Sequence, residues 1–220
     1  MCGICGKVYY DQRRPVEPDI VAAMCERIAH RGPDQRGMYV RGAVGLGSTR
    51  LSIIDVAGGR MPLSNEDGTI WITYNGEIYN FQQLRQQLER AGHRFATDSD
   101  TETIVHLYEE AGDDFVHALN GMFALALWDG RRQRLVLARD HLGIKPLFYA
   151  QLDDRLVFGS EIKALLADGI DRQIDPVALH DYLSLNYVPG PRTMFKDIRK
   201  LLPGHLLTFE AVSGQVRRVF

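Results

Sequence analysis

The second residue of the chain is a cysteine, the side chain best suited to attack a carbonyl carbon. Cys2 follows Met1 directly, and so small a side chain at position 2 favours enzymatic removal of the initiator methionine. One residue would then carry both a thiol and a free α-amine. An α-amine with a pKa of about 8 can accept a proton at neutral pH, and a thiolate is a strong nucleophile. Cys2 could therefore serve as nucleophile and base without a histidine.

Two other interpretations of Cys2 remain open from its immediate neighbours. An isolated cysteine at this position is more often a buried thiol at the start of a strand. The Cys2-x-x-Cys5 spacing is also typical of redox and metal-binding motifs. However, Cys25 is the one further cysteine, whereas a zinc site needs about four ligands. A thioredoxin-like pair would follow a strand within a βαβ unit, so we rank the redox or metal module last.

Turn signals separate short apolar runs along much of the chain, and this pattern predicts β-hairpins. Asp129-Gly130, for example, matches the two-residue turn that suits the twist of paired strands. The predicted hairpins join 37–40 with 44–46, 125–128 with 134–138, 147–149 with 156–158, and 206–209 with 216–219. Helices are predicted over 18–29, from an Asn80 N-cap to Gly92, from Asp100 to Gly112, and from Pro176 to about Leu183. Antiparallel sheets with helices outside them predict an α+β layered domain.

The composition is that of an ordinary globular protein and excludes several classes. The chain has 220 residues, of which 45% are hydrophobic and 25% charged, with a formal net charge of -2. No overall field would attract nucleic acid, and no apolar run approaches the roughly 20 residues that cross a membrane. Three cysteines do not make a disulfide framework, so we expect a cytoplasmic protein. Because the chain stops within a predicted strand, we expect it to be part of something longer.

Eight segments, in chain order, match the motifs of one family. They are Cys2-Gly-Ile4, His30-Arg-Gly-Pro-Asp34, Thr49-Arg-Leu-Ser-Ile53, Tyr74-Asn-Gly-Glu-Ile-Tyr-Asn80, Ser99-Asp100, Asn120-Gly-Met-Phe-Ala124, Arg139-Asp140 with Gly143-Ile-Lys-Pro-Leu147, and Ser160-Glu161. On these motifs the chain resembles the glutaminase domain of class II glutamine amidotransferases, the N-terminal-nucleophile (Ntn) hydrolases. Within them it is most similar to glutamine-dependent asparagine synthetase. Cys5 departs from the apolar residue common there, and the family's Ser-Gly-Gly-x-Asp-Ser-type pyrophosphate loop is absent.

The resemblance implies a fold and a domain division. The fold would be a four-layer αββα sandwich of two antiparallel sheets with outer helices, of the Ntn hydrolase type. Residues 1–205 would form the class II glutamine amidotransferase domain. Residues 206–220 would form a closing hairpin that leads toward an ATP-dependent synthetase domain outside this chain.

The resemblance also implies how the tetrahedral intermediate is stabilised. Asn75 would offer its side-chain amide and Gly76 its backbone N–H to the developing oxyanion. The competing interpretation is a type I′ hairpin turn, for which Asn-Gly is equally typical.

The remaining site residues implied by the resemblance bind L-glutamine at its other end. Arg50 would bind the carboxylate, with backbone groups of Leu51 and Ile53 lining the pocket, and Asp100, assisted by Glu77, would pair with the ammonium group. The plainer interpretations are a strand-end salt bridge for Arg50 and a helix cap for Asp100.

In the implied mechanism, Cys2 attacks the side-chain amide of glutamine, ammonia leaves, and water hydrolyses the γ-glutamyl thioester. We expect no metal or organic cofactor for this half. ATP and Mg are expected for the absent synthetase domain alone, which in the family receives the ammonia and converts aspartate to asparagine. A homodimer is compatible with the sequence. The alternative function is a catalytically silent scaffold that docks or regulates a synthetase, a state that retention of Met1 would produce.

Other chemistry-bearing side chains are expected to be structural. His30 and Arg31 precede a Gly-Pro-Asp loop and should hold its geometry. Lys145 should stiffen a buried turn or meet a neighbouring domain. His93 and His117 have no evident partners in the sequence.

Overall fold

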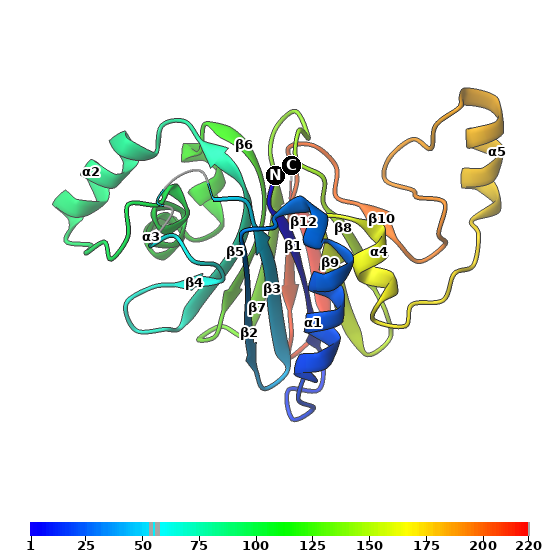
Figure 1. The fold of residues 1–220 in the computed structure, drawn as a ribbon, viewed down its shortest axis with the longest axis horizontal. Helices are drawn as coiled ribbons and strands as arrows, with labels where there is room; N and C mark the ends of the chain where they lie inside the picture. The colour runs from blue at the N-terminus through cyan, green and yellow to red at the C-terminus, as the bar shows by residue number, and fades with distance from the viewer. Residues whose placement is uncertain (53–54, 56–57, 220) are drawn as a thin grey trace.

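The structure is a computed structural model that describes residues 1–52, 55 and 58–219, and its strands pair into two six-stranded antiparallel sheets (Figure 1). The first sheet has the order β10 (Arg199–Lys200), β8 (Phe148–Gln151), β9 (Arg155–Gly159), β1 (Gly3–Tyr9), β3 (Val44–Arg50) and β2 (Gln35–Arg41). The second sheet has the order β12 (Gln215–Val219), β11 (Leu206–Glu210), β7 (Arg134–Arg139), β6 (Gly121–Asp129), β5 (Ile70–Ile78) and β4 (Leu63–Ser64).

Helices cover the outer faces of both sheets. Among the described residues they are α1 (Pro18–Arg27), α2 (Phe81–Ala91), α3 (Asp100–Ala111), α4 (Ile162–Leu166) and α5 (Pro176–Leu185), with short 3-10 helices η1 (Ala29–Arg31) and η2 (Gly112–Ala118). α1 and α4 lie on the first sheet and α2 and α3 on the second, whereas α5 stands apart at one side (Figure 1). No helix in the described part of the chain is long and apolar enough to cross a membrane.

Three buried clusters of side chains fill the spaces between these layers. Met24 of α1 packs with Cys5 of β1 outside the first sheet. Ile4 faces the opposite way and packs between the two sheets. Ile72 of β5 and Ile104 of α3 belong to the third cluster, between the second sheet and its helices. This helix–sheet–sheet–helix order confirms the predicted α+β sandwich.

The two central strands of the first sheet lie in the interior of the molecule. β1 and β3 are buried along their whole lengths, because helices cover one face and the second sheet covers the other. Edge strand β2 is more exposed. Gly3 pairs with Thr49, so the first residues of the chain lie beside the end of β3.

All four predicted hairpins are confirmed as adjacent antiparallel strands. The predicted start and end of α2 are also confirmed, with Gly92 in the left-handed conformation that closes a helix. Asn80 stands at the predicted N-cap position, but its side chain makes no capping hydrogen bond. Its side chain instead bonds the backbone of Ala118 and Asn120, and so ties the chain after η2 to the start of α2. The domain boundary at residue 205 stays a prediction.

Candidate active site

A pocket of about 200 Å³ lies where the start of β1, the end of β3, strand β5 and the first turn of α3 meet. Every predicted site residue that the structure describes lines this pocket: Cys2, Arg50, Leu51, Asn75, Gly76, Glu77 and Asp100. Ile53, the remaining predicted residue, lies outside the described residues. The fold thus gathers side chains from four separate segments around one cysteine.

Cys2 is held in place by one contact of its backbone and one of its side chain. Its carbonyl oxygen accepts a hydrogen bond of 3.0 Å from Nε of Arg31, and Nη1 of Arg31 is anchored to Glu161 at 2.9 Å. The Cys2 Sγ lies 3.6 Å from the carbonyl oxygen of Leu51. Arg31 thus holds the backbone of Cys2, whereas the sequence had assigned it to the Gly-Pro-Asp loop, and these contacts place the sulfur at the pocket wall.

Gly76 lies inside strand β5, so the turn interpretation of Asn-Gly is wrong. The strand continues without a break from Ile70 to Ile78, with Gly76 opposite Phe123 of β6. A Cβ on Gly76 would lie 2.3 Å from the carbonyl oxygen of Met122. Glycine is needed here because β6 approaches too closely for any side chain, and not because the backbone reverses direction.

The N–H of Gly76 points to the open edge of β5. β4 pairs with β5 as far as Ile72, and beyond that point β5 has β6 on one side alone. The N–H of Ile78 donates from the open edge to Asp100. In a regular strand, N–H groups two residues apart point the same way, so the Gly76 N–H is directed to this edge as well.

Asn75 presents a buried amide to the inter-sheet side of β5. Thr73, two residues earlier on the same face, bonds the backbone of Gly47 in the first sheet. The Asn75 side chain therefore faces the sheet that contains β1. Asn75 is 1% exposed, and its Nδ2 has no hydrogen-bond partner. A buried donor without an acceptor is costly, and such a group is a candidate for binding a ligand or a reaction intermediate.

Two carboxylates make the opposite wall of the pocket acidic. Asp100 accepts hydrogen bonds from the Tyr74 hydroxyl at 2.8 Å and the Ile78 N–H at 3.0 Å. Burial raises the pKa of Asp100 although these hydrogen bonds oppose the rise. Burial and the charge of Asp100 also raise the pKa of Glu77. The cap of α3 is Ser99 and not Asp100, so the plain capping interpretation of Asp100 is wrong.

Arg50 is buried at the end of β3 and also lines the pocket. Its guanidinium donates to the Gln35 side chain at 3.1 Å and to the Asp55 carbonyl oxygen at 2.8 Å. These contacts hold a rigid positive charge on the side of the pocket formed by the first sheet. The acidic wall lies on the second sheet and α3, which gives the pocket opposite charges on its two sides.

Sequence reasoning missed Lys145 as a pocket residue. It is buried, lines the pocket, and places its Nζ 3.5 Å from the sulfur of Met1. Its motif was recognised, but the turn that carries it lies far from Cys2 in the sequence. Met1 itself is 58% exposed, so the peptide bond that joins it to Cys2 lies at an open part of the site.

The structure argues against a Cys2–Cys5 redox or metal pair. Residues an odd number apart face opposite sides of a strand. Cys5 accordingly packs outside the first sheet against Cys25, with 3.6 Å between the sulfur atoms, while Cys2 lines the pocket. All three cysteines are free.

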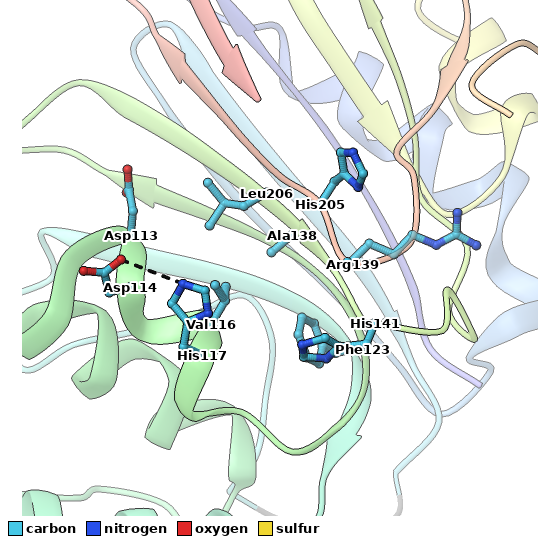
Figure 2. Close-up of a pocket in the computed structure, with 11 residues that line it drawn as sticks. Asp113, Asp114, Val116, His117, Phe123, Ala138, Arg139, His141, His205 and Leu206 are labelled. Carbon is cyan, nitrogen blue, oxygen red and sulfur yellow. Dashed lines mark ion pairs between the residues drawn. The ribbon is translucent and has the colours of Figure 1, made fainter. Parts of the chain in front are cut away.

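Figure 2 shows a second pocket, of about 290 Å³, formed by η2 and the neighbouring ends of β6, β7 and β11. His117, which had no evident partner in the sequence, lies there 3.9 Å from Asp114. Neither a cysteine nor any predicted site residue is among the described residues that line it. The pocket at Cys2 is therefore the better candidate for the chemistry.

The comparison with known families agrees with this placement. The model of the glutamine amidotransferase domain family matches residues 1–219. The chain belongs to this family. The family predicted from the sequence motifs is thus confirmed, and the domain is a glutamine amidotransferase.

Several curated relatives and a solved structure extend the comparison. Asparagine synthetase [glutamine-hydrolyzing] 1 of Bacillus subtilis is 41% identical over 210 residues, which are 93% of this chain and 33% of the relative. Amidase chyE of Penicillium rubens is 39% identical over 181 residues, or 82% of this chain and 26% of the relative. The chain spans about a third of the length of the first of these. The B. subtilis glutamine phosphoribosylpyrophosphate amidotransferase, solved with ADP and GMP, has the same fold, with a TM-score of 0.72 at 22% identity over 99% of this chain and 49% of that one.

Proposed function

We propose that the chain hydrolyses the side-chain amide of L-glutamine to glutamate and ammonia through a thioester on Cys2. One observation carries this proposal. The Cys2 sulfur shares a single pocket with an unpartnered buried amide on Asn75, an edge N–H on Gly76 and the buried carboxylate of Asp100. A nucleophile, two oxyanion donors and a partner for an ammonium group are the parts that this reaction needs.

The reaction begins after Met1 has been removed. The α-amine of Cys2 takes the proton of the thiol, directly or through water, and the sulfur attacks the amide carbon. The Asn75 amide and the Gly76 N–H donate to the oxyanion of the tetrahedral intermediate. As that intermediate collapses, the α-amine returns the proton to the leaving nitrogen and ammonia departs. Water then attacks the γ-glutamyl thioester, which releases glutamate and restores the Cys2 thiol.

The charges across the pocket orient the substrate. Asp100, with Glu77 beside it, attracts the α-ammonium group, while Arg50 attracts the α-carboxylate, and backbone groups of Leu51 and Ile53 complete the binding surface. An amino acid bound in this way extends its side chain toward Cys2.

The ammonia is proposed to serve asparagine synthesis from aspartate in an ATP-dependent synthetase domain of the same polypeptide. The curated relatives support this, because several are named glutamine-hydrolysing asparagine synthetases and are about three times as long as the matched region. We propose that glutamine hydrolysis in this half requires no metal or organic cofactor, that ATP and Mg act in the synthetase domain, and that the protein is cytoplasmic. A homodimer stays a prediction.

The test compares glutamate release by four forms of the protein. Intact mass first identifies which preparation begins at Cys2 and which retains Met1. We expect turnover by the processed form, none by Cys2→Ala, and none by the form that retains Met1. Cys25→Ala is the matched control, because it removes a buried thiol that does not line the pocket, and it should stay active.

Two results would contradict the proposal. Unchanged glutamate release by Cys2→Ala would show that another group is the nucleophile. Glutamine binding without any turnover by the processed form would favour the silent scaffold instead.

A further inference from the structure

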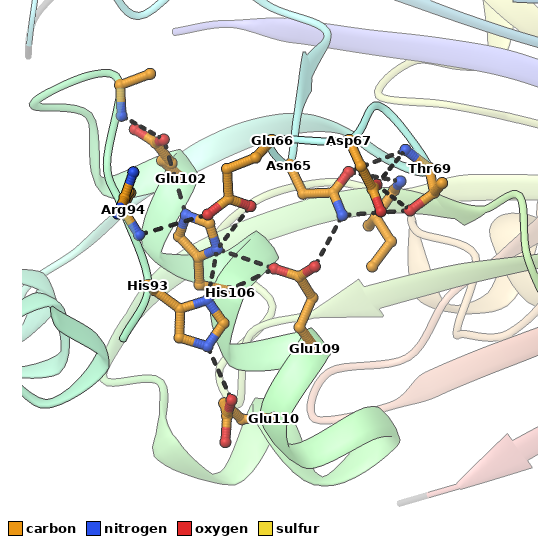
Figure 3. A network of polar contacts seen from close by, with 12 residues as sticks. Asn65, Glu66, Asp67, Thr69, His93, Arg94, Glu102, His106, Glu109 and Glu110 are labelled. Atoms are coloured by element: carbon orange, nitrogen blue, oxygen red, sulfur yellow. Dashed lines mark hydrogen bonds and ion pairs between the residues drawn. The ribbon is translucent and has the colours of Figure 1, made fainter. Parts of the chain in front are cut away.

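A group of histidines and carboxylates lies on the helical side of the second sheet, apart from the candidate active site (Figure 3). His106 comes from α3, His93 from the segment after α2, and Glu66 from the turn between β4 and β5. Ligand atoms of these three residues all lie within 4.8 Å of one another. The sequence interpretation that His93 has no partner is therefore wrong.

The donor atoms are spaced like the ligands of a metal ion. The Nδ1 atoms of His93 and His106 are 3.1 Å apart, and Oε2 of Glu109 lies 2.9 Å from the second and 3.8 Å from the first. Oε2 of Glu66 lies 3.9 Å from Nδ1 of His106. Ligands about 2.0–2.2 Å from a tetrahedral ion are themselves about 3.3–3.6 Å apart. The ligand atoms of Glu66, His93 and His106 already lie within 4.8 Å of one another, and Glu109 approaches both imidazoles from α3.

Both imidazoles turn their other nitrogen toward a carboxylate. Nε2 of His93 lies 2.8 Å from Glu110, within hydrogen-bond distance, whereas Nε2 of His106 lies 3.8 Å from Glu102 and makes no hydrogen bond. A histidine that binds a metal commonly gives its second N–H to a carboxylate in this way, which fixes the tautomer. With the protons on Nε2, both Nδ1 lone pairs point inward at each other and at acceptor oxygens. A metal ion at the centre would take the place of the proton that an Nδ1 could otherwise donate there.

The surroundings of the cluster are rigid and negatively charged. His106 is fully buried, and its Nε2 has no hydrogen-bond partner. Glu102 beside the cluster accepts hydrogen bonds from the backbone N–H groups of Ala96 at 2.8 Å and Thr97 at 2.7 Å, which hold its carboxylate in place. The other oxygen of Glu109 is held by Asn65 at 2.8 Å.

We propose that this cluster binds one divalent transition-metal ion of the zinc type, with Nδ1 of His93, Nδ1 of His106 and the carboxylates of Glu66 and Glu109 as ligands. Imidazole nitrogen with carboxylate oxygen suits zinc, cobalt or nickel better than calcium or magnesium. The ion joins the β4–β5 turn, the α2–α3 connection and α3. Its role is to fix the position of α3, and none of its ligands lines the candidate active site.

The test titrates Zn²⁺ and Co²⁺ into metal-free, tag-free protein that carries Cys2→Ala, so that the pocket thiol cannot bind the probe. We expect one equivalent of metal, a rise in the unfolding temperature, and a cobalt spectrum of four-coordination without a thiolate band. His93→Ala should weaken binding by about 100-fold or more, and Glu110→Gln by about 10- to 100-fold. His117→Ala, whose side chain is 71% exposed outside the cluster, should bind as the parent does.

Several outcomes would overturn the site. They are no binding by the parent, a thiolate band in the cobalt spectrum, or unchanged affinity in His93→Ala. Should His93→Ala fail to fold, Glu66→Gln replaces it, because the Glu66 side chain is 50% exposed and the substitution should not disturb folding. Unchanged affinity in Glu66→Gln would overturn the assignment equally.

Discussion

Asn75→Ala should lower the catalytic rate but leave the free energy of unfolding unchanged or higher. The Asn75 Nδ2 is buried without a partner when no substrate is bound. Its desolvation is then a cost to folding that the oxyanion of the intermediate would offset. Removing the amide therefore removes a benefit during the reaction and a cost in the resting protein.

The two magnitudes follow from the same observation. Loss of one oxyanion donor lowers kcat by about 100- to 1000-fold, or about 2.7–4 kcal/mol. A buried unsatisfied polar group lowers the free energy of unfolding by about 1–3 kcal/mol, and removing it restores that amount. The smaller alanine side chain packs less well, which lowers the free energy of unfolding by about 1 kcal/mol. The free energy of unfolding of Asn75→Ala should therefore be unchanged or higher by up to about 2 kcal/mol. In a chain of this size that is a rise of up to about 8 °C in Tm.

The assay measures kcat and KM for glutamate release alongside urea unfolding monitored by circular dichroism. We expect the whole loss in kcat, with KM for glutamine changed little, because the amide acts on the intermediate and not on the bound substrate. A variant that is destabilised by more than about 2 kcal/mol while keeping kcat would refute the reasoning. So would a rise in KM at unchanged kcat.

Three further predictions concern Gly76 and Asp100 of the pocket and Glu102 of α3. Gly76→Ala should destabilise the protein by about 1–3 kcal/mol and reduce glutamate release, because its Cβ would lie 2.3 Å from the backbone oxygen of Met122. An unfolding midpoint in urea equal to that of the wild type would contradict this. The KM for glutamine should rise as the pH falls toward the raised pKa of Asp100, since protonation removes the charge that pairs with the ammonium group. Asp100→Asn should raise KM at pH 7 and abolish this pH dependence of KM. If the pH dependence persisted in Asp100→Asn, another group would be its cause. Glu102→Gln should lower the free energy of unfolding by about 2–3 kcal/mol, because it weakens hydrogen bonds to the backbone before α3. Since the folded pKa of Glu102 is lowered to about 2, this difference should be full above about pH 4.5 and vanish as the pH falls toward 2, and a difference that grows in acid would refute it.

Local sequence determined most of the elements and singled out Cys2 as the candidate nucleophile. Asp153-Asp154 set the β8–β9 hairpin, because a two-residue turn fixes strand pairing without help from distant residues. The β6–β7 hairpin formed as predicted, but its loop is residues 130–133 and not the two-residue turn expected at Asp129-Gly130, since Asp129 pairs with Arg134. Gly92 ended α2 where its missing Cβ permits the left-handed conformation. Cys2 could be recognised because its nucleophile and its base belong to a single residue.

What the sequence by itself did not determine depends on how distant segments pack. Asn75 and Gly76 suit a turn as well as a strand, and the pairing of β5 with β6 decided between them. Lys145 reaches the pocket, and His93 meets His106, because the packing of layers brings together segments far apart in the chain. A local pattern specifies dihedral angles over a few residues, whereas such meetings follow from the burial of apolar faces across the whole domain. The sequence therefore singled out Cys2, and the tertiary structure decided what surrounds it.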